Sequence, residues 1–216
     1  MKEIPVTFSS GDLTPEGILN LPDGEGPFAA VVVCHPHPLY GGDMNNNVVL
    51  AVCRALADEG IASLRFNFRG VGRSQGQYDH GIGEQNDALA AVSFIASQEA
   101  VGESLGIAGY SFGAGIALRV AQREERIAAV AAISPGPGML DLEPNLYDVR
   151  PILFVQGSRD TFLSPEKFQS SVESFAPPRE VRVIPGADHF WLGREKELSE
   201  MVASFFKRAF EGEITS

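Results

Sequence analysis

Six short apolar runs recur along this chain of 216 residues, and each is bounded by glycine, proline or small polar residues. Runs of this kind are typical of strands that are buried on both faces of a parallel sheet. They cover residues 28–34, 61–68, 104–110, 127–134, 151–156 and 180–184. Segments with helical patterns lie between or after them, at 44–59, 83–98, 112–123, 165–175 and 194–210. The alternation predicts an α/β fold in which helices flank a mostly parallel central sheet.

The segment before Phe28 has a different pattern, with the turn-rich residues 11–15 between two weak strands. This pattern predicts an N-terminal antiparallel hairpin. The chain is long enough to bury one core, and it contains no internal repeat or low-complexity tract. We therefore expect residues 1–216 to form a single domain.

Charge and composition narrow the choice of partners. Acidic residues outnumber basic ones by 28 to 17, which gives a formal charge of −11, and such a surface repels nucleic acid and anionic lipid. No apolar stretch is long enough to span a membrane, and the N-terminus lacks the apolar core of a signal peptide. Cys34 and Cys53 are expected to be free thiols. We expect a cytoplasmic protein with no nucleic-acid or membrane partner, and its oligomeric state stays open between monomer and homodimer.

The segment Gly109–Gly113 reads G-x-S-x-G and lies between a predicted strand and a predicted helix. In this context the motif indicates a nucleophile elbow, in which a sharp turn lifts the serine hydroxyl above the end of the strand. Glycines suit such a turn because they have no Cβ to clash with the crowded backbone. Ser111 is therefore the predicted nucleophile. The structural alternative is a glycine-rich turn with a capping serine.

A serine hydroxyl needs a neighbouring base, and four histidines are available. His189 follows the last apolar run and precedes the last helix, so it can reach across the end of the sheet. His35 and His37 follow the first run and compete with it, whereas His80 lies in a polar, glycine-rich loop. The chain order of an elbow-type site favours His189.

The base in turn needs an acid that orients it. Asp160 follows the run 151–156, and the order Ser111, Asp160, His189 is the one that the elbow motif requires. Asp188 is the rival because it is adjacent to His189, but adjacent residues rarely aim their side chains at each other, so we prefer Asp160. The acidic residues that follow the run 127–134 form a weaker reserve, Asp141 and Glu143.

Acyl transfer also needs N–H donors for the oxyanion of its transition state. The motif places one donor on the backbone of Phe112, the residue after the nucleophile. The second should come from the loop after the first run, where the prolines at 36 and 38 have no N–H. We select His37, and Leu39 and Tyr40 remain open.

Two further features receive structural interpretations. The glycine-rich segment 70–76 misses the dinucleotide-binding pattern G-x-G-x-x-G by one residue and is expected to be a turn after a strand. The histidines and cysteines show no zinc-binding spacing. No cofactor and no metal ion are therefore expected.

With these motifs the chain resembles the α/β-hydrolase superfamily from about residue 28 to 210, most closely a branch of small serine hydrolases related to dienelactone hydrolases. The matching segments are His35-Pro36-His37-Pro38, Gly41-Gly42-Asp43-Met44-Asn45-Asn46, residues 64–72 and Gly109–Gly113. The resemblance implies carboxylesterase-like activity and a triad of Ser111, Asp160 and His189. The chain departs from dienelactone hydrolases proper, which use a cysteine nucleophile, and it lacks the HGGG loop of many lipases.

Many hydrolases of this fold insert a cap domain before the strand that carries the acid. Here only 16 residues, 135–150, are available at that point, so we expect no cap domain and an open site. Candidate residues for the wall of that site are apolar side chains in the surrounding loops: Tyr40, Met139, Leu140, Phe162, Phe190 and Trp191.

The predicted function is a serine hydrolase that cleaves carboxylic esters of small or short-chain acyl groups through an acyl-enzyme, with a small-molecule ester as substrate. A peptidase or thioesterase would use the same triad. A second class of protein, a non-catalytic binding protein with a hydrolase fold, also stays open because a fold does not by itself determine a function.

Overall fold

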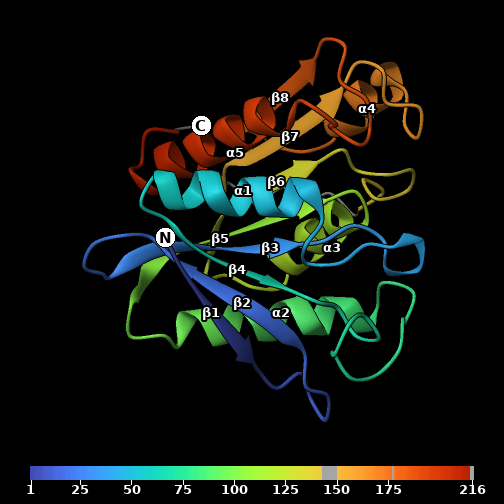
Figure 1. Cartoon of the computed structure of the whole chain (residues 1–216). Helices are drawn as coiled ribbons and strands as arrows, with labels where there is room; N and C mark the ends of the chain where they lie inside the picture. The colour runs from blue at the N-terminus through green and yellow to red at the C-terminus, as the bar shows by residue number, and fades with distance from the viewer. Residues whose placement is uncertain (143–149, 177, 215–216) are drawn as a thin grey trace.

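The computed structural model describes residues 1–142, 150–176 and 178–214. An eight-stranded sheet forms its centre, with the strand order β1-β2-β4-β3-β5-β6-β7-β8 (Figure 1). The strands are β1 (Lys2–Thr7), β2 (Glu16–Leu21), β3 (Phe28–Cys34), β4 (Ala62–Phe66), β5 (Val101–Tyr110), β6 (Ile127–Ile133), β7 (Ile152–Gly157) and β8 (Arg179–Ile184). All six predicted strands are present, and the α/β class is confirmed.

The N-terminal strands β1 and β2 pair antiparallel with each other, and β2 pairs antiparallel with β4. The predicted hairpin is therefore confirmed. From β4 to β8 every neighbouring pair is parallel. This arrangement brings the carboxyl ends of these strands to one edge of the sheet, on the right of Figure 1.

Helices cover both faces of the sheet. On one face, α1 (Asn47–Asp58) and α5 (Glu195–Phe210) lie side by side, and their apolar side chains share a core with the sheet (Figure 1). On the other face lie α2 (Gly83–Ala96), α3 (Phe112–Ala121) and α4 (Pro165–Val172). A short 3-10 helix, Pro38–Tyr40, follows β3.

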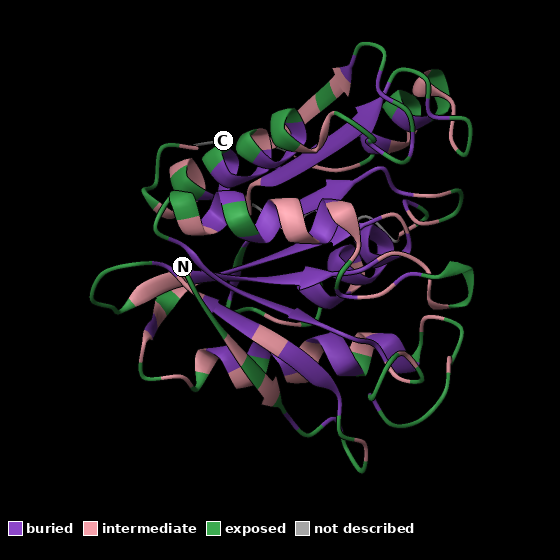
Figure 2. Ribbon diagram, viewed as in Figure 1, coloured by how far each residue is buried: buried purple, intermediate pink, exposed green. Residues whose placement is uncertain are grey.

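The central strands are largely apolar because both of their faces are covered. In β3, for example, Val31 and Val33 point into the core beneath α1 and α5, and Val32 points into the opposite core. Figure 2 shows these strands mostly buried, with intermediate or exposed residues only near the start of β3, β5 and β6, whereas the edge strands β1 and β8 carry such residues along most of their length. Cys34 and Cys53 lie in these cores as free thiols, and burial raises the pKa of Cys53 to about 11.

The connection between β6 and β7 is too short for a cap domain, as predicted. Its described residues before the gap form bends and turns, and β7 starts at Ile152. Glu143, one of the reserve acids, lies outside the described residues.

Candidate active site

Ser111 occupies a sharp turn between β5 and α3. Its backbone has φ 55° and ψ −115°, a strained conformation that a nucleophile elbow requires. A Cβ on Gly109 would lie 2.0 Å from the carbonyl oxygen of Gly113, and a Cβ on Gly113 would lie 2.4 Å from that of Cys34. Only glycine fits at either position, which explains the spacing of the motif.

The structure brings the side chains of Ser111, His189 and Asp160 into one chain of hydrogen bonds. The Nε2 atom of His189 is 3.1 Å from Oγ of Ser111, and its Nδ1 atom is 2.8 Å from Oδ2 of Asp160. A carboxylate accepts only, so its partner Nδ1 carries a proton and Nε2 is left as an acceptor for the serine hydroxyl. This arrangement can remove a proton from the serine.

Neighbouring loops hold the acid and the base in place. The carboxylate of Asp160 is inaccessible to solvent, and its Oδ1 atom accepts a hydrogen bond from the backbone N–H of Phe162 at 2.9 Å. The loops after β7 and β8 touch at Gly157, where a Cβ would lie 2.3 Å from the carbonyl oxygen of Ala187. His189 is also buried, with 6% of its surface exposed. These contacts preorganise both side chains.

The rival acids do not take this position. Oδ1 of Asp188 accepts hydrogen bonds from the backbone N–H groups of Phe190 and Trp191, at 2.9 and 3.1 Å. Asp188 therefore stabilises the turn that follows it, and Asp141 is exposed on its own loop. Asp160 is the acid that contacts His189.

His35 is also buried at the carboxyl-end edge of the sheet, but it is not part of the hydrogen-bonded chain of Ser111, His189 and Asp160. Its Nε2 atom accepts a hydrogen bond from the backbone N–H of Phe68 at 3.1 Å, and its Nδ1 atom lies 2.6 Å from the carbonyl oxygen of Pro36. Burial lowers its pKa to about 4. His35 therefore holds two loops together in its neutral form, while His80 is exposed in the loop before α2.

Hydrogen bonds within the loop after β3 distinguish the three candidates for the second oxyanion donor. The N–H of Leu39 donates to Nδ1 of His37 at 3.2 Å, and the N–H of Tyr40 donates to the carbonyl oxygen of His37 at 3.1 Å. Within the described residues, no acceptor pairs with the backbone N–H of His37 or of Phe112. Their side-chain rings lie 4.9 Å apart. Of the three candidates in this loop, His37 is thus the one whose backbone N–H has no acceptor among the described residues, and Phe112 follows Ser111 directly in the chain.

Two of the six predicted wall residues prove to be core residues. Trp191 has no exposed surface, and its indole N–H donates to Oγ of Ser134 at 3.0 Å. Leu140 is 5% exposed and packs in the core. Apolar loop residues can turn inward and cover the sheet as easily as they can line a site, and these two side chains pack inward.

The other four wall candidates reach the surface to different degrees. Tyr40, Phe162 and Phe190 are more than half exposed. Met139 is partly buried and lines a cavity of about 230 Å³ together with Phe112.

Sequence reasoning missed two supporting residues. The hydroxyl of Tyr110, the residue before the nucleophile, donates to the backbone carbonyl of His189 at 2.7 Å. Asn47, at the start of α1, donates through Nδ2 to the carbonyl oxygen of Phe190 at 3.2 Å and to Glu195 at 3.0 Å. No local pattern marks these residues, since each acts on a segment more than seventy residues away.

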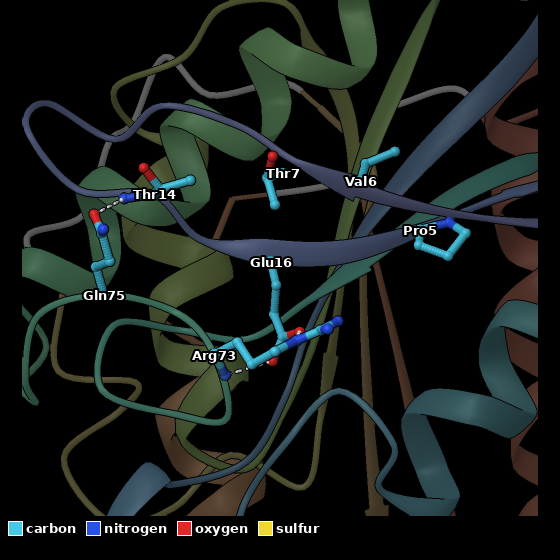
Figure 3. Close-up of a pocket in the computed structure, with 7 residues that line it drawn as sticks. All are labelled: Pro5, Val6, Thr7, Thr14, Glu16, Arg73 and Gln75. Atoms are coloured by element: carbon cyan, nitrogen blue, oxygen red, sulfur yellow. Dashed lines mark hydrogen bonds and ion pairs between the residues drawn. The ribbon is translucent and has the colours of Figure 1, made fainter.

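A groove of about 430 Å³ lies far from Ser111, beside the hairpin of β1 and β2 (Figure 3). Its polar groups pair with one another. Glu16 accepts hydrogen bonds from the backbone N–H and Nε of Arg73 and from Nδ2 of Asn67. Burial raises the pKa of Glu16, but these hydrogen bonds outweigh that effect and keep it below the ordinary value. The glycine-rich segment 70–76 therefore acts as a structural turn that carries Arg73 to Glu16.

Within the described ranges, no three histidine, cysteine or acidic side chains come together in a way that would hold a metal ion. The helices of the same residues are all too short or too polar to cross a membrane.

A model of the alpha/beta hydrolase domain family matches residues 29–210. The chain belongs to the alpha/beta hydrolase family. A protein from Rickettsia prowazekii of uncharacterized function is 34% identical over 213 residues, and the match covers 88% of each chain. The predicted superfamily is thus confirmed, and the link to dienelactone hydrolases stays a prediction.

Two solved structures are close to this hydrolase. An alpha-beta serine hydrolase homologue from Coxiella burnetii is 34% identical, with a TM-score of 0.82 over 94% of this chain and 96% of that one. A protein from Xanthomonas campestris, described as an a/b serine hydrolase without lid, is 29% identical, with a TM-score of 0.81 over 100% and 97% of the two chains. The family and these neighbours support hydrolase activity.

Proposed function

We propose that this alpha/beta hydrolase is a serine esterase that cleaves carboxylic esters through an acyl-enzyme. The observation that carries the proposal is the continuous chain of hydrogen bonds from Ser111 through His189 to Asp160. The two solved relatives described as serine hydrolases support the same chemistry. The substrate is a small-molecule ester.

In the first half of the reaction, Oγ of Ser111 attacks the ester carbonyl while Nε2 of His189 takes its proton. Asp160 holds the imidazole by its Nδ1–H and stabilises the positive charge that forms. When the tetrahedral intermediate collapses, the same proton passes from Nε2 to the oxygen of the leaving alcohol. Water then attacks the acyl carbon while His189 takes one of its protons. The second tetrahedral intermediate collapses by breaking its bond to Oγ of Ser111, His189 returns the proton to Oγ, and the acyl group leaves as the carboxylic acid.

The oxyanion of each tetrahedral intermediate is held by the backbone N–H groups of Phe112 and His37. Neither group has an acceptor among the described residues, which supports this assignment, and Phe112 directly follows Ser111 in the chain. A donor that is already oriented needs no rearrangement as the charge develops, and this is the basis of its catalytic effect. Phe112 is also the first residue of α3, so the helix dipole favours negative charge at the same point.

The open site favours esters of small or short-chain acids. Among the residues that the structure describes, no domain covers Ser111, so a long acyl chain would keep much of its surface in water and gain little from binding. This expectation concerns the acyl side of the ester only.

The test is labelling with a fluorophosphonate, run on the wild type and on Ser111→Ala, together with turnover of p-nitrophenyl acetate and p-nitrophenyl octanoate. We expect the wild type to be labelled and to hydrolyse the acetate faster than the octanoate. Both labelling and turnover should disappear in Ser111→Ala. A folded wild type that is neither labelled nor active on the esters would overturn the proposal, and faster turnover of the octanoate would overturn its acyl preference.

A further inference from the structure

Exposed apolar side chains gather at the edge of the sheet that carries Ser111. Among the described residues, seven large apolar side chains are exposed, and six of them lie in loops at the carboxyl ends of the strands: Leu39, Tyr40, Ile82, Phe162, Phe190 and Leu192. The seventh, Met1, lies at the opposite edge beside Asp23. Burying any of these six against another molecule would remove apolar surface from water.

Two of these side chains contact the base itself. The ring of Phe162 lies against the imidazole of His189, with centroids 4.2 Å apart and planes at 32°. The ring of Phe190 meets the same imidazole edge-on at 5.7 Å and meets Phe162 edge-on at 6.1 Å. His189 is buried while both phenylalanines are about half exposed, at 52% and 53%. We call this pair the Phe162–Phe190 shelf.

The Phe162–Phe190 shelf is not needed to hold the imidazole of His189 in place, because other side chains already do so. Tyr110 packs its ring at 5.6 Å from His189, and Asp160 holds Nδ1. These buried contacts already set the orientation of the imidazole. Phe162 and Phe190 remain about half exposed to solvent while contacting the imidazole that must protonate the leaving group.

The position of the leaving group follows from the proposed chemistry. The leaving oxygen must lie within hydrogen-bond distance of Nε2 of His189, because that atom returns the proton to it. The carbon groups on that oxygen therefore lie next to the side chains that surround the imidazole at the surface. We infer that the Phe162–Phe190 shelf binds the alcohol part of the substrate, and that this alcohol carries an apolar ring. The inference rests on the proposed esterase function.

Space for a larger alcohol continues beyond the shelf. Phe162 forms one wall of a groove of about 450 Å³ between the loop after β6 and α4. The groove is otherwise lined largely by polar side chains, among them Asp141, Ser164 and Lys167. The ring of the alcohol would thus contact the shelf, and polar substituents on it would extend toward α4.

The experiment compares two isomeric esters that place the same ring on opposite sides of the ester bond. Benzyl acetate carries it on the alcohol, and methyl phenylacetate carries it on the acid. A third ester, 2-methoxyethyl acetate, has an acetyl group and an alcohol of comparable acidity but no ring. We expect kcat/KM for benzyl acetate to exceed that for each of the other two by about tenfold, the effect of one apolar contact in a pocket.

Variants then assign the preference to the shelf. In Phe190→Ala the ratio of kcat/KM for benzyl acetate to that for 2-methoxyethyl acetate should fall to near one. Leu192→Ala is the matched control, because Leu192 is 74% exposed in the same loop and has no aromatic ring that could pack on His189. It should keep the wild-type ratio. Phe190→Leu, which keeps an apolar side chain, should give an intermediate ratio.

The outcomes separate the two proposals. A wild type that is labelled by the fluorophosphonate and hydrolyses all three esters without preferring benzyl acetate overturns the shelf while leaving the esterase in place. A preference for methyl phenylacetate also overturns the shelf and leaves the esterase in place. A preference for benzyl acetate that survives in Phe190→Ala does the same. Absence of both labelling and turnover in the folded wild type overturns the esterase, and the shelf with it.

Discussion

The loops after β3 and β8 each carry a buried histidine at the same edge of the sheet, yet the two side chains have different partners. His35 meets the backbone N–H of Phe68 and the carbonyl oxygen of Pro36. His189 meets the hydroxyl of Ser111 and the carboxylate of Asp160. Burial and position alone therefore do not make a histidine a base. A proton can be passed only where one nitrogen faces a group that gives it up and the other faces a group that stabilises the charge.

The comparison also explains the rigidity of the β3 loop. His35 ties this loop to the segment after β4, and a Cβ on Gly42 would lie 2.1 Å from the carbonyl oxygen of Pro36, so the loop folds tightly on itself. The oxyanion donor that we propose, His37, therefore lies on a loop that is already ordered. One histidine would thus serve catalysis by proton transfer, and the other by holding structure.

The largest expected effect is the loss of activity in His189→Ala. Without a base, kcat for p-nitrophenyl acetate should fall by about 10⁴- to 10⁶-fold. The variant should remain folded, because Tyr110 and the loop contacts of Asp160 persist. Steady-state kinetics and thermal unfolding followed by circular dichroism measure the two effects. Retention of more than a tenth of the wild-type kcat would remove His189 from the mechanism.

His35→Ala should have the opposite profile, a large loss of stability. The buried N–H of Phe68 would lose its acceptor and a cavity would replace the ring, so the free energy of unfolding should fall by about 2–4 kcal/mol. Urea unfolding at pH 8 measures this loss. His35→Gln is the control, since its amide can still pair with the N–H, and it should lose less. Equal stability of His35→Ala and the wild type would contradict a structural role.

Acid should destabilise the protein partly through His35. Its pKa falls from 6.5 to about 4 on folding, so between these two values the unfolded chain binds the proton and the folded chain does not. The contribution is fully present above pH 6.5 and is lost as the pH falls toward 4, by roughly 3 kcal/mol. Urea unfolding across this range should show a steeper pH dependence for the wild type than for His35→Gln. Parallel curves would refute the assignment.

The smallest expected effect concerns the positioning of His37. The hydroxyl of Tyr78 is 3.2 Å from Nε2 of His37, whereas Tyr40 contacts the same imidazole only through its ring, at 4.7 Å. Tyr78→Phe should lower kcat about three- to tenfold with little change in KM, because a less well-held oxyanion donor acts in the transition state. Tyr40→Phe is the matched control and should keep the wild-type kcat. An equal effect of both substitutions would argue against the hydrogen bond.

Much of this molecule was predictable because it depends on local patterns. Strands buried on both faces must be apolar, so they stand out as runs, and the elbow needs glycines where the backbone is crowded. Asp160 was preferred to Asp188 because neighbouring residues rarely point at each other, and the structure places Asp160 beside His189 while Asp188 caps its own turn. The N-terminal hairpin and the short connection before β7 were predictable for the same reason.

Other features depended on contacts between distant segments. Trp191 and Phe190 are adjacent aromatic residues, yet one is fully buried and the other is 53% exposed. Tyr110 supports the backbone of a residue 79 positions away. Sequence alone determined the strands, the elbow and the order of the three polar side chains, because each follows from local backbone geometry or from chain order. The packing of separate loops at the edge of the sheet sets which loop side chains turn inward and which backbone N–H groups lack an acceptor, so neither could be read from chain order or from local backbone geometry.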